Sequence, residues 1–269
     1  MNMHLIICII SIILSLLFCP IIFKMLINSN GLKPNYKGEK IPFCMGIVFI
    51  LVQTISLIIT YLIIKMDIEI LYYLISIILI GLVGLLDDLI GVEDIKGLKG
   101  HIISFFKGNP TTGSIKAGIG FLISLLFSFL ISKTILDIIV NTLLIALFTN
   151  YNNIFNLRPG RSIKAFIFAS AALLLTKDIN RFDYFIYSFY GILLIYFPMD
   201  LKAKAMMGDV GSNVLGITLG IYCAMSTGII AKFIYLVILI IIHIIAEKYS
   251  FTKIIESNRI LRFIDNLGR

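Results

Sequence analysis

Long apolar runs separated by short polar segments make up most of this chain. A helix that crosses a bilayer needs roughly 20 mostly apolar residues. The candidate runs occupy nine stretches: 3–24, 43–65, 69–88, 116–132, 134–150, 162–176, 184–198, 212–230 and 232–246. Lipid admits only helices or closed barrels, and these runs lack the alternation of barrel strands. We therefore predict an all-α fold: a polytopic integral membrane helical bundle of about nine transmembrane helices.

The polar segments between the runs carry unequal positive charge. Segments 24–42, 87–116, 150–164, 199–211 and the tail from Glu247 hold 18 of the 23 Lys and Arg residues. Because short loops rich in Lys and Arg stay in the cytoplasm, we expect these segments inside, the N-terminus outside and the C-terminus inside. The predicted organisation is a transmembrane domain over 1–246 and an amphipathic cytoplasmic tail over 247–269.

Composition supports the membrane assignment and narrows the partners. The chain of 269 residues is 59% hydrophobic and only 14% charged, whereas soluble domains are about a quarter charged. Its net charge of +8 is scattered through short loops, which favours anionic lipids or phosphorylated substrates over nucleic acid. Lys253, Arg259, Arg262 and Arg269 of the tail are expected to face lipid phosphates.

An adjacent acid pair, Asp87 and Asp88, stands at the end of an apolar run. Carboxylates are costly at a membrane edge and repel each other, so the pair requires a metal ion, a proton or a basic partner. Asp209 lies between two glycines in "MMGDVGS". Small neighbours let a ligand approach closely, and Asp is a suitable oxygen ligand for Mg²⁺. We expect Asp209 to be the metal ligand, beside Asp87 or Asp88.

Three further polar segments are candidates for substrate binding. Lys33, Lys37 and Lys40 precede "IPFCMG", where they are either membrane-surface lysines or phosphate ligands, and Lys40 is the one selected for substrate binding. Lys116 follows "NPTTGS" at a helix start, which is either a capped turn or an anion site. The segment "NYNNIFNLRPGR" supplies Asn150, Asn153, Asn156, Arg158 and Arg161. Its amides suit sugar or base groups and its guanidinium groups suit phosphate, although a polar capped turn has the same composition. We expect His101 to be structural.

In their order along the chain, these segments resemble the polyprenyl-phosphate N-acetylhexosamine-1-phosphate transferases. "IPFCMG" resembles the family's first-loop motif, "LLDDLIG" its Asp-Asp motif, and "TTGSIKA" its Thr/Lys element. "NYNNIFN" resembles the start of its Asn-rich motif, and "MMGDVGS" is similar to its M-G-D-x-G-S motif. The likeness runs from about Pro34 to Gly216.

The resemblance implies an Mg²⁺-dependent enzyme of the cytoplasmic leaflet of the cell membrane. It would transfer a sugar-1-phosphate from a UDP-sugar to polyprenyl (undecaprenyl) phosphate, releasing UMP in cell-envelope glycan synthesis. Asp87, Asp88 and Lys116 would be catalytic, and Asp209 would hold the metal. The substrate-binding residues would be those listed here: Lys40, Asn150, Asn153, Asn156, Arg158 and Arg161. A homodimer is compatible with this reading.

The sequence departs from the family pattern in several places, one of which is "LRPG", where the family has G-x-D-G. Asn156 stands where the family has an aspartate, and the tail lacks the family's histidine-rich loop. These departures keep open a catalytically inactive homologue that acts as a scaffold or lipid-phosphate binder. A transporter is a third hypothesis. The clustering of polar groups on one side of the membrane argues against it, because a transporter should carry polar groups near the bilayer midplane.

Overall fold

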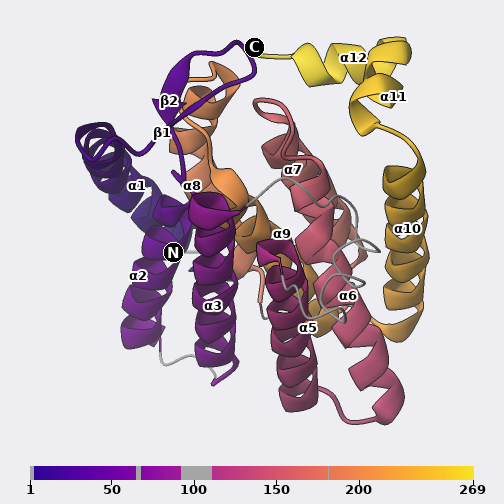
Figure 1. Ribbon diagram of the computed structural model, residues 1–269. Coiled ribbons are helices and arrows are strands. Elements are labelled where there is room, and N and C mark those ends of the chain that lie inside the picture. The colour runs from indigo at the N-terminus through magenta and orange to yellow at the C-terminus, as the bar shows by residue number, and fades with distance from the viewer. Residues whose placement is uncertain (1–2, 65–67, 92–110, 181) are drawn as a thin grey trace.

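The computed structural model describes residues 3–64, 68–91, 111–180 and 182–269, and within them it is a bundle of helices (Figure 1). Helices account for 79% of the chain, which confirms the all-α class. The helices in the described residues are α1 (Met3–Asn28), α2 (Ile47–Ile64), α3 (Glu69–Ile90), α5 (Thr112–Ile131), α6 (Ile135–Ile154), α7 (Arg161–Thr176), α8 (Tyr184–Leu201), α9 (Gly208–Ser226), α10 (Ile229–Lys248), α11 (Phe251–Ser257) and α12 (Arg259–Asn266).

Each of the nine predicted apolar runs coincides with one helix from α1 to α10. Among the described residues, six helices are long and apolar enough to cross a membrane: α1, α3, α5, α6, α8 and α10. The other three are α2 and α7, which are shorter, and α9, which carries Gly, Ser, Thr and Asn among its apolar residues. Nine spans and their orientation therefore remain predictions.

Helix α9 is buried along nearly all of its length and packs against α3 and α6. Glycines make this closeness to α6 possible: a Cβ on Gly216 would lie 2.4 Å from the Phe148 carbonyl oxygen. One on Gly220 would lie 2.6 Å from the Ile145 Cα atom. Small residues four apart are a common means of bringing membrane helices into contact. The polar start of α9 is thereby fixed at one end of the bundle.

A short antiparallel hairpin was not predicted from the sequence. Strand β1 (Leu32–Pro34) pairs with β2 (Lys40–Pro42) in the register Leu32↔Pro42. The turn between them is closed by the side-chain oxygen of Asn35, which accepts from the backbone N–H groups of Lys37 and Glu39. Gly38 has a φ of +84°, a conformation that suits glycine. The first polar loop is therefore an ordered element.

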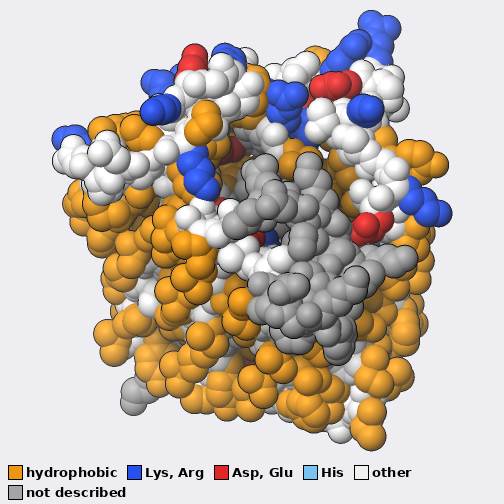
Figure 2. All heavy atoms as spheres, in the orientation of Figure 1, with side chains coloured by type: hydrophobic (Ala, Val, Ile, Leu, Met, Phe, Trp, Pro, Cys, Tyr) orange, Lys and Arg blue, Asp and Glu red, His pale blue; other side chains and the backbone are white. Residues whose placement is uncertain are grey.

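Charged side chains gather at one end of the molecule. In Figure 2, Lys and Arg lie over the end that carries the hairpin, α11 and α12, while the rest of this face is mostly hydrophobic. The C-terminus of α3 and the N-termini of α5 and α9 carry the candidate acids and lysine. This distribution agrees with the charge split predicted from the loops.

Several polar side chains within the bundle bond to one another. Gln53 donates to the Tyr73 hydroxyl at 3.0 Å and accepts from the Ser188 hydroxyl at 2.6 Å. Tyr73 also contacts the Thr218 hydroxyl at 2.9 Å. Buried polar groups that bond to each other stabilise the packing of their helices. We therefore attribute this network to the association of the helices and not to a binding site.

Candidate active site

Lys116 of α5 joins two of the three acids that the sequence analysis singled out. Its ammonium group lies 2.5 Å from Asp87 Oδ2, at the end of α3, and also contacts Asp209 Oδ2, at the start of α9. All three side chains are largely shielded from solvent. We call this group the bridge. Two carboxylates from helices far apart in sequence thus converge on one cation.

The adjacent Asp88 has a different environment from Asp87. Its side chain is only 7% exposed, and its two oxygens accept from the backbone N–H groups of Asp209, at 2.9 Å, and Val210, at 3.1 Å. A carboxylate at a helix N-terminus satisfies free amides and interacts favourably with the helix dipole. Asp88 therefore caps α9 and fixes α3 against it, which leaves Asp87 to face Lys116.

Backbone contacts hold the start of α9 against the segment that follows the hairpin. Met45 N–H donates to the Met206 carbonyl at 3.0 Å, and Gly46 N–H donates to the Met207 carbonyl at 2.9 Å. Gly208 adopts a φ of +69°, and a Cβ there would lie 2.2 Å from Asp88 Oδ2. The glycine before Asp209 is thus required both by the backbone conformation and by the closeness of the cap.

A pocket of about 210 Å³ opens beside these acids. It is formed by the hairpin, the segment after α6 and the segment before α9, and its polar lining includes Asn35, Tyr36, Asp88, Asn156, Arg158, Asp200 and Asp209. Tyr36 and Arg158, which both line it, contact each other, with the guanidinium carbon 5.1 Å from the ring centroid. The pocket lining thus combines acids with an aromatic ring and a cation.

Two predicted asparagines lie at the site. Asn156 donates to the Gly208 carbonyl at 3.1 Å, immediately before Asp209. Asn153 Oδ1 accepts from the Ser212 hydroxyl at 3.0 Å, within the first turns of α9. Because α6 continues to Ile154, the predicted loop begins later than expected. Both side chains tie the end of α6 to the start of α9.

Three other predicted binding residues lie elsewhere. Lys40 is exposed on β2 and lines a separate surface groove, and Asn150 is exposed on α6 outside the pocket. Arg161, predicted to bind phosphate, is 5% exposed and holds Asp265 of α12 in a two-point ion pair. Its guanidinium group is therefore engaged by the C-terminal segment, and Arg161 does not line the pocket.

Lys33 and Tyr36 belong to the site, although the sequence analysis did not separate Lys33 from the neighbouring lysines and did not select Tyr36. Lys33 Nζ donates to the Asp88 backbone carbonyl at 2.5 Å and lies over the Phe43 ring. In the sequence, Lys33, Lys37 and Lys40 share the same polar segment. Only the hairpin register distinguishes Lys33, so no local signal could have identified it.

The residues present fit a magnesium ion held jointly with a substrate. In the described ranges, no group of three His, Cys, Asp or Glu side chains is arranged to bind a metal. Mg²⁺ is commonly bound through one or two carboxylates together with waters and substrate phosphates. Asp87 and Asp209 already reach a common cation, so two carboxylates are available once Lys116 moves aside.

Part of the predicted site lies outside the described residues. This part includes His101 and the Gly108–Pro110 portion of the predicted anion-binding turn. From Thr111 onward, Thr111 and Ser114 form a reciprocal capping box, and Lys116 follows in the second turn of α5. The capped-turn interpretation therefore holds for the described portion.

Comparison with known proteins does not place the chain in a family. No protein-family model matches it, and no curated protein matches it.

Proposed function

We propose that this protein is a phosphoglycosyl transferase of the membrane surface, which moves a sugar-1-phosphate from a UDP-sugar to a polyprenyl phosphate. The observation that supports this most directly is the convergence of Asp87, Lys116 and Asp209 beside a pocket at the charged end of the bundle. Three alternating charges from three helices suit a reaction in which several phosphate charges meet. The motif resemblance assigns the same three residues to that reaction.

The chemistry is the displacement of one phosphate ester by another. An oxygen of the lipid phosphate attacks the sugar-bearing phosphorus of the UDP-sugar. The bond from that phosphorus to the oxygen of UMP breaks, and UMP leaves with the electron pair. Catalysis of phosphoryl transfer depends mainly on positioning and on neutralising charge. A bound Mg²⁺ would supply that neutralisation at the diphosphate.

The chain's own residues have separate tasks in this proposal. Asp209 and Asp87 would hold the metal ion, and Asp87 would also orient or deprotonate the attacking phosphate. The ammonium group of Lys116 would leave the two carboxylates and pair with a substrate phosphate. Asp88, engaged by two amides, would keep the start of α9 in place. Asn153 and Asn156 would support the same turn from α6.

The pocket accommodates only part of a sugar nucleotide. Its volume of about 210 Å³ is below the roughly 300–1,000 Å³ common for ligand pockets. We assign it to the diphosphate and one adjoining ring, with the Tyr36–Arg158 pair beside that ring. The prenyl chain would lie in lipid against the apolar helix surfaces. The active site would face the cytoplasm of a multi-pass protein of the cell membrane.

Substitution of Asp209 tests the proposal. Purified, detergent-solubilised protein is incubated with undecaprenyl phosphate, Mg²⁺ and a panel of UDP-sugars, and UMP release is measured. Asp209→Asn should lower it by at least about 100-fold, because a ligand to the charge-neutralising ion is weakened. Asp137→Asn, the same change at the start of α6, is the matched control. Unchanged turnover in Asp209→Asn would refute the metal assignment.

An inactive, ligand-binding homologue is the second candidate. Asn156 replaces the aspartate of the family pattern, and its amide group serves as a donor to the Gly208 carbonyl. A carboxylate there would repel that carbonyl, so this position is suited to structure and not to acid–base chemistry. Saturable UDP-sugar binding by the wild-type protein, without UMP release for any sugar in the panel, would favour this candidate.

A further inference from the structure

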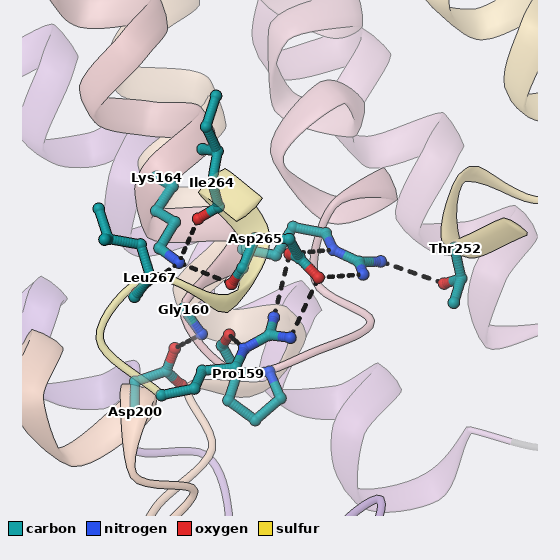
Figure 3. Close-up of polar contacts among 10 residues, drawn as sticks. Pro159, Gly160, Lys164, Asp200, Thr252, Ile264, Asp265 and Leu267 are labelled. Atoms are coloured by element: carbon teal, nitrogen blue, oxygen red, sulfur yellow. Dashed lines mark hydrogen bonds and ion pairs between the residues drawn. The ribbon is translucent and has the colours of Figure 1, made fainter. Parts of the chain in front are cut away.

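The C-terminal segment is attached to the bundle at several points, and one carboxylate is central to them. Asp265 of α12 accepts two hydrogen bonds from Arg161, both at 2.9 Å, and two from Arg269, at 3.0 and 3.1 Å (Figure 3). Each guanidinium group uses two nitrogens on the two oxygens, the strongest geometry for this pair. We call these three residues the clasp. The sequence analysis had assigned Arg269 to lipid phosphates, whereas the structure pairs it within the chain.

Lys164 and Thr252 add contacts on both sides of the clasp. The Lys164 ammonium group donates to the backbone carbonyls of Ile264, Asp265 and Leu267, at 2.7–2.8 Å, as Figure 3 shows. These carbonyls belong to the end of α12, where a helix leaves acceptors without internal partners. The third Arg161 nitrogen donates to the Thr252 hydroxyl of α11 at 3.1 Å. Both short helices are thereby attached to the first turns of α7.

The clasp also reaches the loop between α6 and α7. Arg269 Nε donates to the Pro159 carbonyl at 2.8 Å, and Gly160 N–H donates to Asp200 Oδ2 of α8 at 2.6 Å. Gly160 has a φ of +76°, so the chain turns sharply just before Arg161. The loop is therefore held on one side by the chain terminus and on the other by α8.

The same loop forms one wall of the candidate active site. Its residues 156–159 all line the pocket, and this segment includes Arg158 opposite Tyr36 and Asn156 bonded to the Gly208 carbonyl. Asp265 itself does not line the pocket. Its effect on the pocket would be transmitted through Arg161, Arg269 and Pro159.

We propose that Asp265 is a positioning residue, through which the last turn of the chain keeps loop 156–160 in the conformation of the pocket wall. Removal of its charge leaves two guanidinium groups, one of them 5% exposed, without their shared carboxylate. The Pro159 contact of Arg269 depends on the same carboxylate for its orientation. The identity of the pocket's ligand rests on the proposed function, but the coupling between tail and loop does not.

The test combines amide hydrogen exchange with ligand binding in the full-length, detergent-solubilised protein. Asp265→Asn should accelerate exchange in residues 156–161 by roughly tenfold or more, because several charge-assisted hydrogen bonds are lost together. It should weaken UMP binding in the presence of Mg²⁺ by about the same factor, since the bound loop conformation is less populated. Asp265→Glu should restore part of both effects.

The matched control is Arg262→Gln, which removes a charge from the exposed side of α12. It should leave both readouts unchanged. Arg269→Gln is the milder clasp variant, and it decides the question if Asp265→Asn fails to fold. Unaltered loop exchange in the clasp variants would overturn the proposal, as would faster exchange with unaltered UMP affinity.

Failure of the proposed function gives a different result. A wild-type protein that does not bind UMP, while Asp265→Asn still accelerates loop exchange, would refute the nucleotide substrate and support the positioning role. In activity assays of a working transferase, loss of positioning should raise KM for the UDP-sugar and leave kcat within about twofold. A fall in kcat alone would contradict a role in ligand positioning.

Discussion

The bridge and the clasp are both built from carboxylates and basic side chains, but the ratio of acids to bases is reversed between them. In the bridge, one ammonium group lies between two carboxylates, Asp87 and Asp209. In the clasp, one carboxylate lies between two guanidinium groups, Arg161 and Arg269. The bridge carries excess negative charge beside a pocket, whereas the clasp carries excess positive charge and lies outside it. The first arrangement is suited to admitting another cation, and the second to fastening the chain.

The two regions also differ in the kind of donor that their carboxylates receive. Asp265 accepts four hydrogen bonds from two planar groups, a fixed geometry that leaves its oxygens fully used. Lys116 is a flexible point charge, which can exchange partners at lower cost. The Lys116 contacts are therefore better suited to exchange, as the proposed reaction requires, and the Arg contacts to permanent attachment.

The largest effect is expected from removal of the bridge cation. Lys116→Met leaves two shielded carboxylates facing each other, which should lower the free energy of unfolding by roughly 3 kcal/mol. Added Mg²⁺ should recover much of this loss, because the ion then takes the place of the ammonium group. Thermal unfolding can be followed with a thiol-reactive dye, since all four cysteines are at least partly buried. Equal unfolding temperatures with and without Mg²⁺ would contradict this view of the bridge.

A smaller loss is expected from the neighbouring aspartate. Asp88→Ala removes the cap of α9 and should cost about 1–2 kcal/mol. Unlike the loss caused by Lys116→Met, this one should not be recovered by Mg²⁺, because Asp88 bonds to amides and not to the bridge cation. The same dye measurement distinguishes the two variants. If Mg²⁺ restored the stability of Asp88→Ala, both acids of the pair would be implicated in metal binding.

Acid should open the clasp. Burial on its own would raise the pKa of Asp265, but hydrogen bonds and charge from Arg161 and Arg269 outweigh it and hold this pKa below its usual value. The clasp therefore contributes its full stability above about pH 4, where an unfolded aspartate is ionised, and loses it as pH falls through the lowered folded value. The difference in exchange of loop 156–161 between the wild type and Asp265→Asn should be constant from neutral pH to about pH 5, and should shrink only below that, because both proteins share the contact of Gly160 with Asp200. A difference that shrinks already near pH 6 would show that a group other than Asp265 controls the clasp.

The smallest effects are expected at two residues that the sequence analysis assigned to the substrate. Asn150→Ala and Lys40→Gln should each change stability by less than about 0.5 kcal/mol, since both side chains are exposed. UMP affinity should stay within about twofold, because neither residue lines the pocket. A tenfold loss of affinity for either variant would mean that the ligand extends beyond the pocket.

The sequence predicted the helices better than it predicted contacts between loops. Apolar runs located every helix from α1 to α10 in the described residues, because burial in lipid and in the bundle imposes the same composition. Hairpin β1–β2 was missed because it depends on a turn at Asn35 and on the contact of Pro42 with the distant Met206, whose N–H donates to the Pro42 carbonyl at 2.9 Å. Such contacts join distant segments and leave no periodic signal.

The same reasoning explains which site residues could be found. Asp87, Asp209 and Lys116 stand out because charged groups are costly beside apolar runs. The division of labour between Asp87 and Asp88 could not be predicted, because it depends on how α3 is rotated against α9. Arg161 and Arg158 look alike in sequence, yet one holds Asp265 and the other lines the pocket. Only the position of the chain's last turn separates them.

The backbone pairing of Met45 and Gly46 with Met206 and Met207 has a consequence for the order of biosynthesis. A ribosome delivers the chain from the N-terminus, so the segment after the hairpin must wait for its partner until Met207 has emerged. Until then, the early helices can enter the bilayer, but the end that carries the candidate site stays unfinished. A protein truncated before that residue should insert and yet contain no assembled site.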